Sequence, residues 1–296
     1  MPTLKEIKGR IGSVKSTLKI TSAMKLVSSA KLRKAQQAVE AMRPYEATLQ
    51  HMLAMVGGTA CAPEGSNAHR DVEMGAACAP EASSAHRPAA IIAIASNSSL
   101  CGGFNANAIA KVRSVRQPGD VVFSVGRKMA DAMRRDGFTT PEDLNALIEH
   151  PAYAPAAALV ERLAQDVEKG RYARVLLVYN HFVSTARQEP VAEQLLPMAV
   201  ISSEVEKSEK EDSDILVEPG RKELLESLLP KTLKLKLYAA LLDSAAAEHA
   251  ARTVAMQMAT DNAENLLSEL TLQYNKGRQQ KITSEILDLA GGQNNE

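Results

Sequence analysis

The chain has 296 residues, and its 35 Lys and Arg balance its 35 Asp and Glu, so the formal net charge is zero. A neutral chain of this length can form one large or two small domains, and its overall charge does not indicate a nucleic-acid binder. Aromatic residues make up only 3%, which favours long, closely packed helices over an aromatic core. The three cysteines form no C-x-x-C motif and indicate a reducing compartment.

A heptad pattern over residues 3–56 predicts one long helix. Twelve of the sixteen seam positions are apolar, and the repeat is the one that makes two helices wrap around each other. At about 1.5 Å per residue this helix would be roughly 80 Å long, so it needs a partner helix. Pro44 predicts a kink rather than an end. The seam positions are Leu4, Ile7, Ile11, Val14, Leu18, Thr21, Lys25, Ser28, Leu32, Ala35, Val39, Met42, Glu46, Leu49, Leu53 and Val56.

The N-terminal segment is basic, with nine Lys or Arg and a single acid, Glu6, between Met1 and Val39. A solvated helix face and an electrostatic contact with an acidic partner both remain open. The segment has no apolar core of a signal peptide, and no stretch of the chain reaches the ~20 apolar residues of a membrane span. It is basic and amphipathic like a mitochondrial presequence, but the unbroken heptad favours mature protein.

Residues 58–87 form an unusual insertion after Gly57 and Gly58, which are predicted to end the helix. It contains an internal repeat, since Ala60–Arg70 and Ala77–Arg87 are nearly the same sequence. The segment lacks large apolar residues, so we expect a flexible loop. A metal site is the alternative, although its ligand spacing is wider than in compact zinc sites. The four ligands of that site would be Cys61, His69, Cys78 and His86.

Residues 88–202 are predicted to form a Rossmann-like α/β domain. Apolar runs at 89–96, 120–125 and 174–180 predict buried strands, and 183–189 with 191–197 predict a strand pair around Pro190. Helical patterns follow at 105–115, 126–136 and 155–169. An acidic loop is expected at 203–220. A second long helix occupies 221–296, with Pro230 starting its main part. The simplest fold is an antiparallel coiled coil of the two terminal helices, with the α/β domain inserted between them.

Motifs that carry chemistry are absent. The LCGGFN turn at residues 100–105 follows a predicted strand but lacks the third glycine of a dinucleotide fingerprint, and there is no P-loop. The six histidines form no triad order, and His249 with Arg252 on the apolar face of the last helix indicates an interface. We therefore expect no catalytic, cofactor or metal residues in a folded site.

Five separated motifs resemble the gamma subunit of F-type ATP synthases. They run in order along nearly the whole chain, which makes the resemblance specific. Two positions depart from the family: Asn97-Ser98 stands for its D-R, and Gly291-Gly292 stands for its terminal G-A. The motifs are Met24–Gln36 (MKLVSSAKLRKAQ), Ser99–Asn105 (SLCGGFN), Glu193–Pro197 (EQLLP), Ala259–Ala263 (ATDNA) with Tyr274–Lys276 (YNK), and Ile282–Ile286 (ITSEI).

The resemblance implies a rotor shaft that does no chemistry itself. Its paired helices would turn inside a ring of alpha and beta subunits, and its α/β domain would bind the epsilon subunit and the membrane c-ring. Its location would be peripheral, on the cytoplasmic face of the cell membrane. By motif position, one contact set with beta-subunit loops would be Met24, Lys25, Lys31 and Arg33, with Arg252 on the facing helix. A second set would be Arg278, Gln279, Thr283 and Glu285.

Two other classes compete with this interpretation. A coiled-coil structural or nucleic-acid-associated protein would use the basic N-terminal segment as an arm and bind DNA in a salt-dependent way. It leaves the α/β insertion without a role. A Rossmann enzyme would need a complete phosphate loop and a catalytic residue, which the sequence does not contain. Co-purification with alpha and beta chains separates the three classes.

Overall fold

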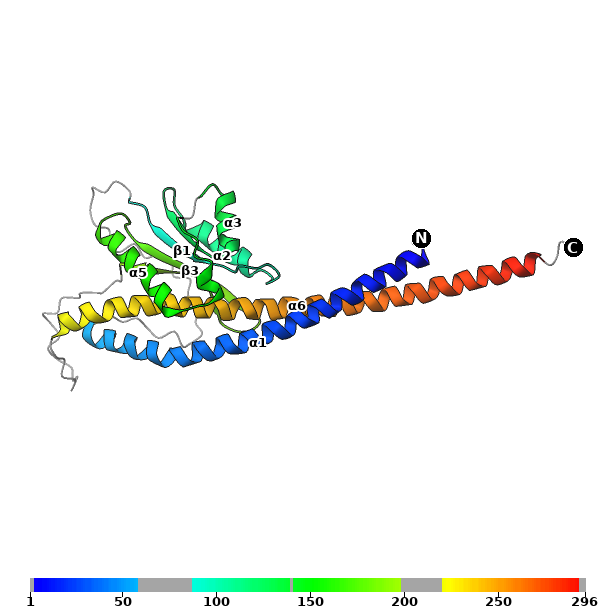
Figure 1. Cartoon of the computed structure of the whole chain (residues 1–296), viewed down its shortest axis with the longest axis horizontal. Helices are drawn as coiled ribbons and strands as arrows, with labels where there is room; N and C mark the ends of the chain where they lie inside the picture. The colour runs from blue at the N-terminus through cyan, green and yellow to red at the C-terminus, as the bar shows by residue number, and fades with distance from the viewer. Residues whose placement is uncertain (1–2, 58–86, 139–140, 198–219, 293–296) are drawn as a thin grey trace.

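The computed structural model describes residues 3–57, 87–138, 141–197 and 220–292 (Figure 1). Two long helices, α1 (Leu4–Gly57) and α6 (Arg221–Gly292), run antiparallel, and a small α/β domain lies against the first part of α6. Helix α6 has 72 residues and α1 has 54. Since an α-helix rises about 1.5 Å per residue, α6 is the longer of the two. A Cβ on Gly277 would lie 3.2 Å from Leu4 Cδ2, so α1 begins at the level of Gly277, and α6 continues beyond that level without it.

The seam predicted for the first helix is confirmed. Every seam position with a described side chain, from Leu4 to Leu53, is buried or half-buried. The partner helix comes from the same chain, and α1 continues through Pro44 as predicted. At the far end of the pair, Leu49 and Leu53 pack against Leu228 and Leu235 of α6. Burial of this apolar stripe stabilises the pair, at roughly 25 cal/mol per Å² removed from water.

The prediction that Pro230 starts the main part of the C-terminal helix is wrong. The helix begins at Arg221, and Pro230 lies inside it. Proline removes one backbone hydrogen bond from a helix interior. Here the turn that precedes it is held by packing, because Leu228 is buried against α1 and Leu224 and Leu225 lie partly buried beside it. Tertiary packing offsets the lost bond.

The domain is built on a four-stranded sheet in the order β2-β1-β3-β4. Strands β2 (Val121–Val125), β1 (Ala90–Ile94) and β3 (Val175–Phe182) are parallel, and β4 (Gln188–Leu196) is antiparallel to β3 at the edge. All five residues of β1 are buried, as its continuous apolar run predicts for a strand covered on both faces.

Helices cover both faces of this sheet. On one face lie α2 (Phe104–Val115) and α3 (Arg127–Arg135), packed on alternate residues of β1. The other face is covered by α4 (Ala146–Glu149), α5 (Tyr153–Glu168) and α6. Leu237 and Leu241 of α6 belong to the same core as Ile92 and Ile94 of β1. The domain and the long helix therefore share one core.

The predicted strand pair at 183–189 and 191–197 is wrong. The antiparallel pair is β3 with β4, and the chain reverses between Phe182 and Gln188. Ser184 and Arg187 close that reversal with backbone hydrogen bonds of 3.0 and 3.2 Å. Pro190 lies inside β4, opposite Asn180. A proline is tolerated there because β4 is an edge strand, whose outer N–H groups need no ladder partner.

The predicted fold class is confirmed: an antiparallel coiled coil of the terminal helices carries an inserted Rossmann-like domain. Two other predictions fall almost wholly outside the described residues. They are the repeat-containing insertion at 58–87, with its Cys61, His69, Cys78 and His86 ligand set, and the acidic loop at 203–220. Both stay predictions.

Candidate partner-binding surfaces

The first predicted contact set lies on one stretch of α1, which we call the waist surface: Met24, Lys25, Lys31 and Arg33. Lys31 and Arg33 are exposed, while Met24 and Lys25 are half-buried beside the seam. Exposed apolar side chains gather near the waist surface: Ile20, Leu26 and Val27 are 60%, 70% and 57% exposed. Because α1 already has α6 as its partner helix, these side chains indicate a further binding partner.

The polar gap in the heptad seam is a point of close helix packing. Thr21 and Ser28 are buried, at 8% and 3% exposed. The Thr260 hydroxyl of α6 donates to Thr21 Oγ1 at 3.0 Å. Next along α1, Leu32 packs on Ala246 and Ala250 of α6, both fully buried. Small side chains let the two helices approach closely, and the hydroxyls of Thr21 and Thr260 are satisfied by hydrogen bonds.

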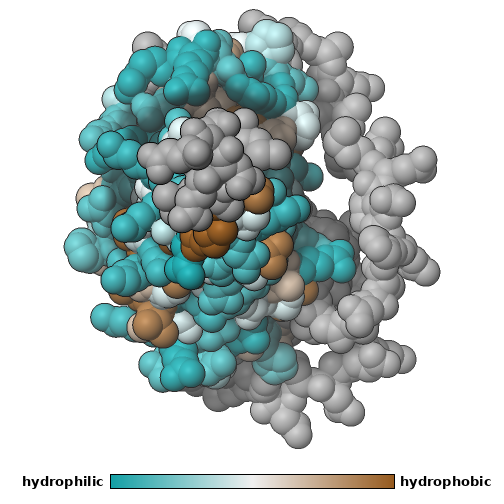
Figure 2. Space-filling model, turned by 90° about the vertical axis from the view of Figure 1, so that its right-hand side faces the viewer, coloured by the Kyte–Doolittle hydropathy of each residue, from teal (hydrophilic) through white to brown (hydrophobic). Residues whose placement is uncertain are grey.

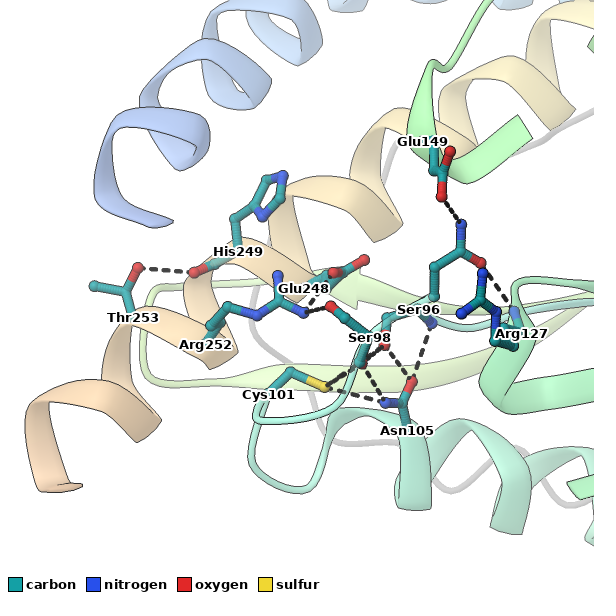
Figure 3. A network of polar contacts seen from close by, with 11 residues as sticks. Ser96, Ser98, Cys101, Asn105, Arg127, Glu149, Glu248, His249, Arg252 and Thr253 are labelled. Atoms are coloured by element: carbon teal, nitrogen blue, oxygen red, sulfur yellow. Dashed lines mark hydrogen bonds and ion pairs between the residues drawn. The ribbon is translucent and has the colours of Figure 1, made fainter. Parts of the chain in front are cut away.

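Arg252, the predicted member of the contact set on α6, points into the chain (Figure 3). Its Nη2 pairs with Glu248 Oε1 at 2.7 Å and donates to Ser98 Oγ at 2.7 Å. The side chains of Arg252 and Glu248 are 10% and 11% exposed. The structure thus brings Arg252 to the turn after β1, and the residue adds no open cationic surface.

Burial shifts the pKa values of the ionisable groups around Arg252. It raises the pKa of the Glu248 carboxyl, and the charges of Arg252 and Lys31 oppose that rise. Burial also lowers the pKa of His249 to about 4, and the same two charges act in the same direction. The Nδ1 of His249 has no hydrogen-bond partner among the described residues. The imidazole is therefore neutral at pH 7.

The turn after β1 lies where doubly wound folds bind a ligand. Such ligands occupy the crevice at the carboxyl ends of the strands where the winding reverses, here between β1 and β3. Within the turn, Asn105 Oδ1 accepts hydrogen bonds from the Ser96 backbone N–H at 3.0 Å and from its hydroxyl at 2.9 Å. Side chains of α6 pack into the crevice, which agrees with a structural role for this turn. The apolar cluster there is Cys101, Phe104, Phe182, Ala247 and Ala251.

The second predicted contact set, which we call the tip surface, is Arg278, Gln279, Thr283 and Glu285. All four are exposed on the part of α6 beyond its contact with α1. Their polar contacts are local to the helix, such as the Thr283 hydroxyl donating to Gln279 O at 2.9 Å. Viewed from this end of the molecule, hydrophilic residues dominate, with separate apolar spots between them (Figure 2). The open apolar residues of the tip are Ile282, Ile286 and Leu287, at 44%, 60% and 64% exposed.

Within residues 3–57, 87–138, 141–197 and 220–292, no group of three or more His, Cys, Asp or Glu is placed to hold a metal ion. No helix in the same ranges combines the length and apolar character of a membrane crossing.

Comparison with known proteins identifies the family. A family model described as ATP synthase matches residues 3–295. A protein of Phocaeicola vulgatus named ATP synthase gamma chain is 44% identical, over 99% of this chain and 99% of its own length. Proteins of the same name from Bacteroides thetaiotaomicron and Flavobacterium johnsoniae are 43% and 40% identical, each over 99% of this chain and over 99% and 98% of their own lengths. The chain belongs to the gamma-chain family of F-type ATP synthases.

Solved structures agree with the gamma-chain fold. A chain of the Euglena gracilis mitochondrial ATP synthase (OSCP/F1/c-ring) has a TM-score of 0.67 at 20% identity, covering 98% of this chain and 93% of that one. A chain of the Tetrahymena thermophila mitochondrial ATP synthase central stalk and c-ring has a TM-score of 0.56 at 23% identity, covering 81% and 99%. At these identities the likeness shows the fold alone. The resemblance seen in the sequence motifs is confirmed by the family match, and the chain is a subunit of an ATP synthase.

Sequence reasoning missed three residues of this gamma chain's polar interface. Glu248 precedes Arg252 by one helical turn on an apolar face, a spacing that signals an ion pair. Thr260 belongs to the ATDNA motif, and Ser98 is a departure from the family pattern. No local signal connects them to their partners, because the Ser98–Arg252 and Thr21–Thr260 contacts span 154 and 239 residues.

Proposed function

We propose that this chain is the central-stalk rotor subunit of a proton- or sodium-translocating ATP synthase. It would couple ion flow through the c-ring to ATP synthesis in the alpha/beta ring. The exposed tip of α6 carries this proposal. A single helix that exposes Ile282, Ile286 and Leu287 to solvent favours a site enclosed by other subunits. Its other end is built into the core of the α/β domain, as a shaft fixed in a foot would be.

In this proposal the chain does no chemistry itself, and the catalytic sites belong to the beta subunits. The tip surface and the waist surface face the alpha/beta ring. The α/β domain binds the epsilon subunit and the c-ring. The chain meets the membrane only through the c-ring, as a peripheral protein on the cytoplasmic face of the cell membrane.

We assign the contacts with the beta-subunit loops to these two surfaces. The exposed cations Lys31 and Arg33 favour acidic loops through charge complementarity. At the tip, Arg278 and Glu285 are exposed and offer both signs of charge. Arg252 is only 8% exposed, so its role would be indirect: it holds the turn after β1 against α6 through Ser98.

A shaft of this kind acts through its asymmetry. Its two-helix waist and one-helix tip present different side chains to each surrounding catalytic subunit. A subunit shifts between states only by the difference in its binding free energy for the shaft in those states. A few kcal/mol is enough, since shifting a ratio from 1:99 to 99:1 takes about 5.5 kcal/mol. Close packing of α1 on α6 supplies the stiffness that rotation needs.

The test is co-expression with the alpha, beta and epsilon chains of the same synthase. We expect the chain to purify with an ATP-hydrolysing ring. The double variant Lys25→Glu/Arg33→Glu should still assemble but pump fewer ions per ATP hydrolysed, because two contacts would change sign. The matched control is Arg135→Glu, an exposed cation on α3, which should keep the wild-type ratio.

Two results would contradict the proposal. One is purification of the wild-type chain without alpha and beta chains. The other is an unchanged pumping ratio in the Lys25→Glu/Arg33→Glu complex. Salt-dependent DNA binding by the purified chain would instead support the nucleic-acid-associated alternative.

A further inference from the structure

The contact between the α/β domain and α6 has two parts of different physical character. The first is apolar and extended: Leu233, Leu237 and Leu241 of α6 join the core beneath β1. Apolar contact is non-directional, so directional polar contacts add to the definition of the domain's angle about the helix axis. The second part is polar. Three ion pairs, His181–Asp243, Lys234–Glu161 and Lys236–Glu193, join the domain to α6 with side chains that are partly open to solvent. A fourth polar contact, in which the charged pair on α6 is only about a tenth exposed, lies at the turn after β1.

The backbone of that turn is shaped to meet α6. Leu100 and Gly102 have positive φ values of 67° and 58°, a conformation that residues other than glycine seldom adopt. A Cβ on Gly102 would lie 3.8 Å from Ala255 Cβ, so the turn passes within van der Waals contact of the helix. Cys101 is 2% exposed beneath it, against Ala247 and Ala251.

The polar contact at the turn after β1 is directional. Its two charged side chains on α6 are buried, whereas Ser98 is exposed on the turn. The Arg252 guanidinium joins Glu248, one turn earlier on α6, to Ser98 on the turn, with both contacts at 2.7 Å (Figure 3). Ser98 lies next to Asn97, whose side chain also ties the turn to the rest of the domain. Its Oδ1 accepts from the Arg127 backbone N–H at 2.9 Å, and its Nδ2 donates to Glu149 Oε1 at 2.9 Å.

We propose that Ser98, Glu248 and Arg252 form a clamp that narrows the range of angles of the α/β domain about α6, so that torque on the domain passes to the paired helices. Arg252 would connect α6 to the domain, Glu248 would hold the Arg252 guanidinium in one orientation, and Ser98 would accept its hydrogen bond on the domain side. All three are positioning residues. The role in torque transfer rests on the proposed function, whereas the narrowed range of angles does not.

The range of angles is measured on the isolated full-length chain. Nitroxide labels are placed on Arg135→Cys of α3 and Glu264→Cys of α6, both exposed, with Cys61 and Cys78 replaced by serine. Pulsed electron resonance then gives the distribution of domain-to-helix distances. We expect one narrow distribution in the parent chain, a broader one in Ser98→Ala and Glu248→Gln, and recovery of the narrow one in Ser98→Thr, which keeps the hydroxyl. The matched control is Ser114→Ala, an exposed serine of α2 whose hydroxyl bonds only within its helix.

Torque transfer is measured in the assembled synthase as ions pumped per ATP hydrolysed. Ser98→Ala should lower this ratio several-fold, and Ser98→Thr should restore it. A contact that merely stabilises the fold would lower the melting temperature while leaving the distance distribution narrow, and that result overturns the proposal. A broad distribution with a wild-type pumping ratio overturns it as well. Failure of the wild-type chain to join alpha and beta subunits speaks against the proposed function, while the distance measurement still decides the clamp.

Discussion

The two ends of α6 are built in opposite ways although they belong to one continuous helix. From Leu228 to Ala263 the helix is buried at regular intervals against α1 and the domain, with alanines, paired charges and hydrogen-bonded hydroxyls at the contacts. Beyond Ala263 none of the described side chains is buried. The difference teaches that stability resides in the first part, while the end of α6 beyond Gly277, where α1 no longer covers it, is left open for a partner.

The largest expected effect comes from breaking the buried ion pair in the first part. Arg252→Ala leaves Glu248 buried without its partner, which should lower the free energy of unfolding by about 3–5 kcal/mol. Arg278→Ala at the exposed tip should change it by about 0.5 kcal/mol or less. Urea unfolding of both variants followed by circular dichroism is the measurement. Equal losses in the two variants would remove the contrast between the two parts of α6.

Overpacking tests the same contrast with an apolar change. Ala250 is fully buried against Leu32, so Ala250→Leu should cost about 1–3 kcal/mol as the two helices are forced apart. Ala30→Leu, at an exposed position of α1, should be near neutral. The readout is the urea midpoint of each variant. A tolerated leucine at 250 would show that the helices are not closely packed at this level.

Acid should destabilise the buried part through His249. Its pKa is lowered from 6.5 to about 4, so the unfolded chain binds more protons between these values and stability falls as pH drops through this window. Discounting for partial exposure, the loss between pH 7.5 and 4.5 should be about 1–2 kcal/mol. His249→Gln should remove it. Glu46 and Glu248, whose pKa values are raised by burial, are common to both proteins, so the difference between the two pH profiles isolates the histidine.

The smallest effect is expected at the polar gap in the seam. Thr21→Val and Thr260→Val together should show a coupling of about 1 kcal/mol in a double-mutant cycle, since the hydroxyls bond each other across the buried interface. Thr271→Val is the control, because this exposed hydroxyl bonds only to Leu267 O of its own helix. Zero coupling between the two threonines would make the gap a defect of packing.

Local patterns were enough for much of the architecture. The seam from Leu4 to Leu53 could be predicted because each apolar residue repeats at the period that faces a partner helix. The buried strand at Ala90–Ile94 could be predicted because a short continuous apolar run is typical of a strand covered on both sides. The motifs from Met24 to Ile286 were sufficient to place the chain in its family.

Other features depended on contacts that no short window contains. Pro230 is tolerated inside α6 because Leu228 packs against α1, and Pro190 is tolerated in β4 because that strand lies at the sheet edge. The sequence alone determined which segments are helix or strand and which family they form, since those signals repeat locally. Only the tertiary structure decided that Arg252 turns inward to Ser98 and that Thr21 meets Thr260, because these partners lie 154 and 239 residues apart in the sequence.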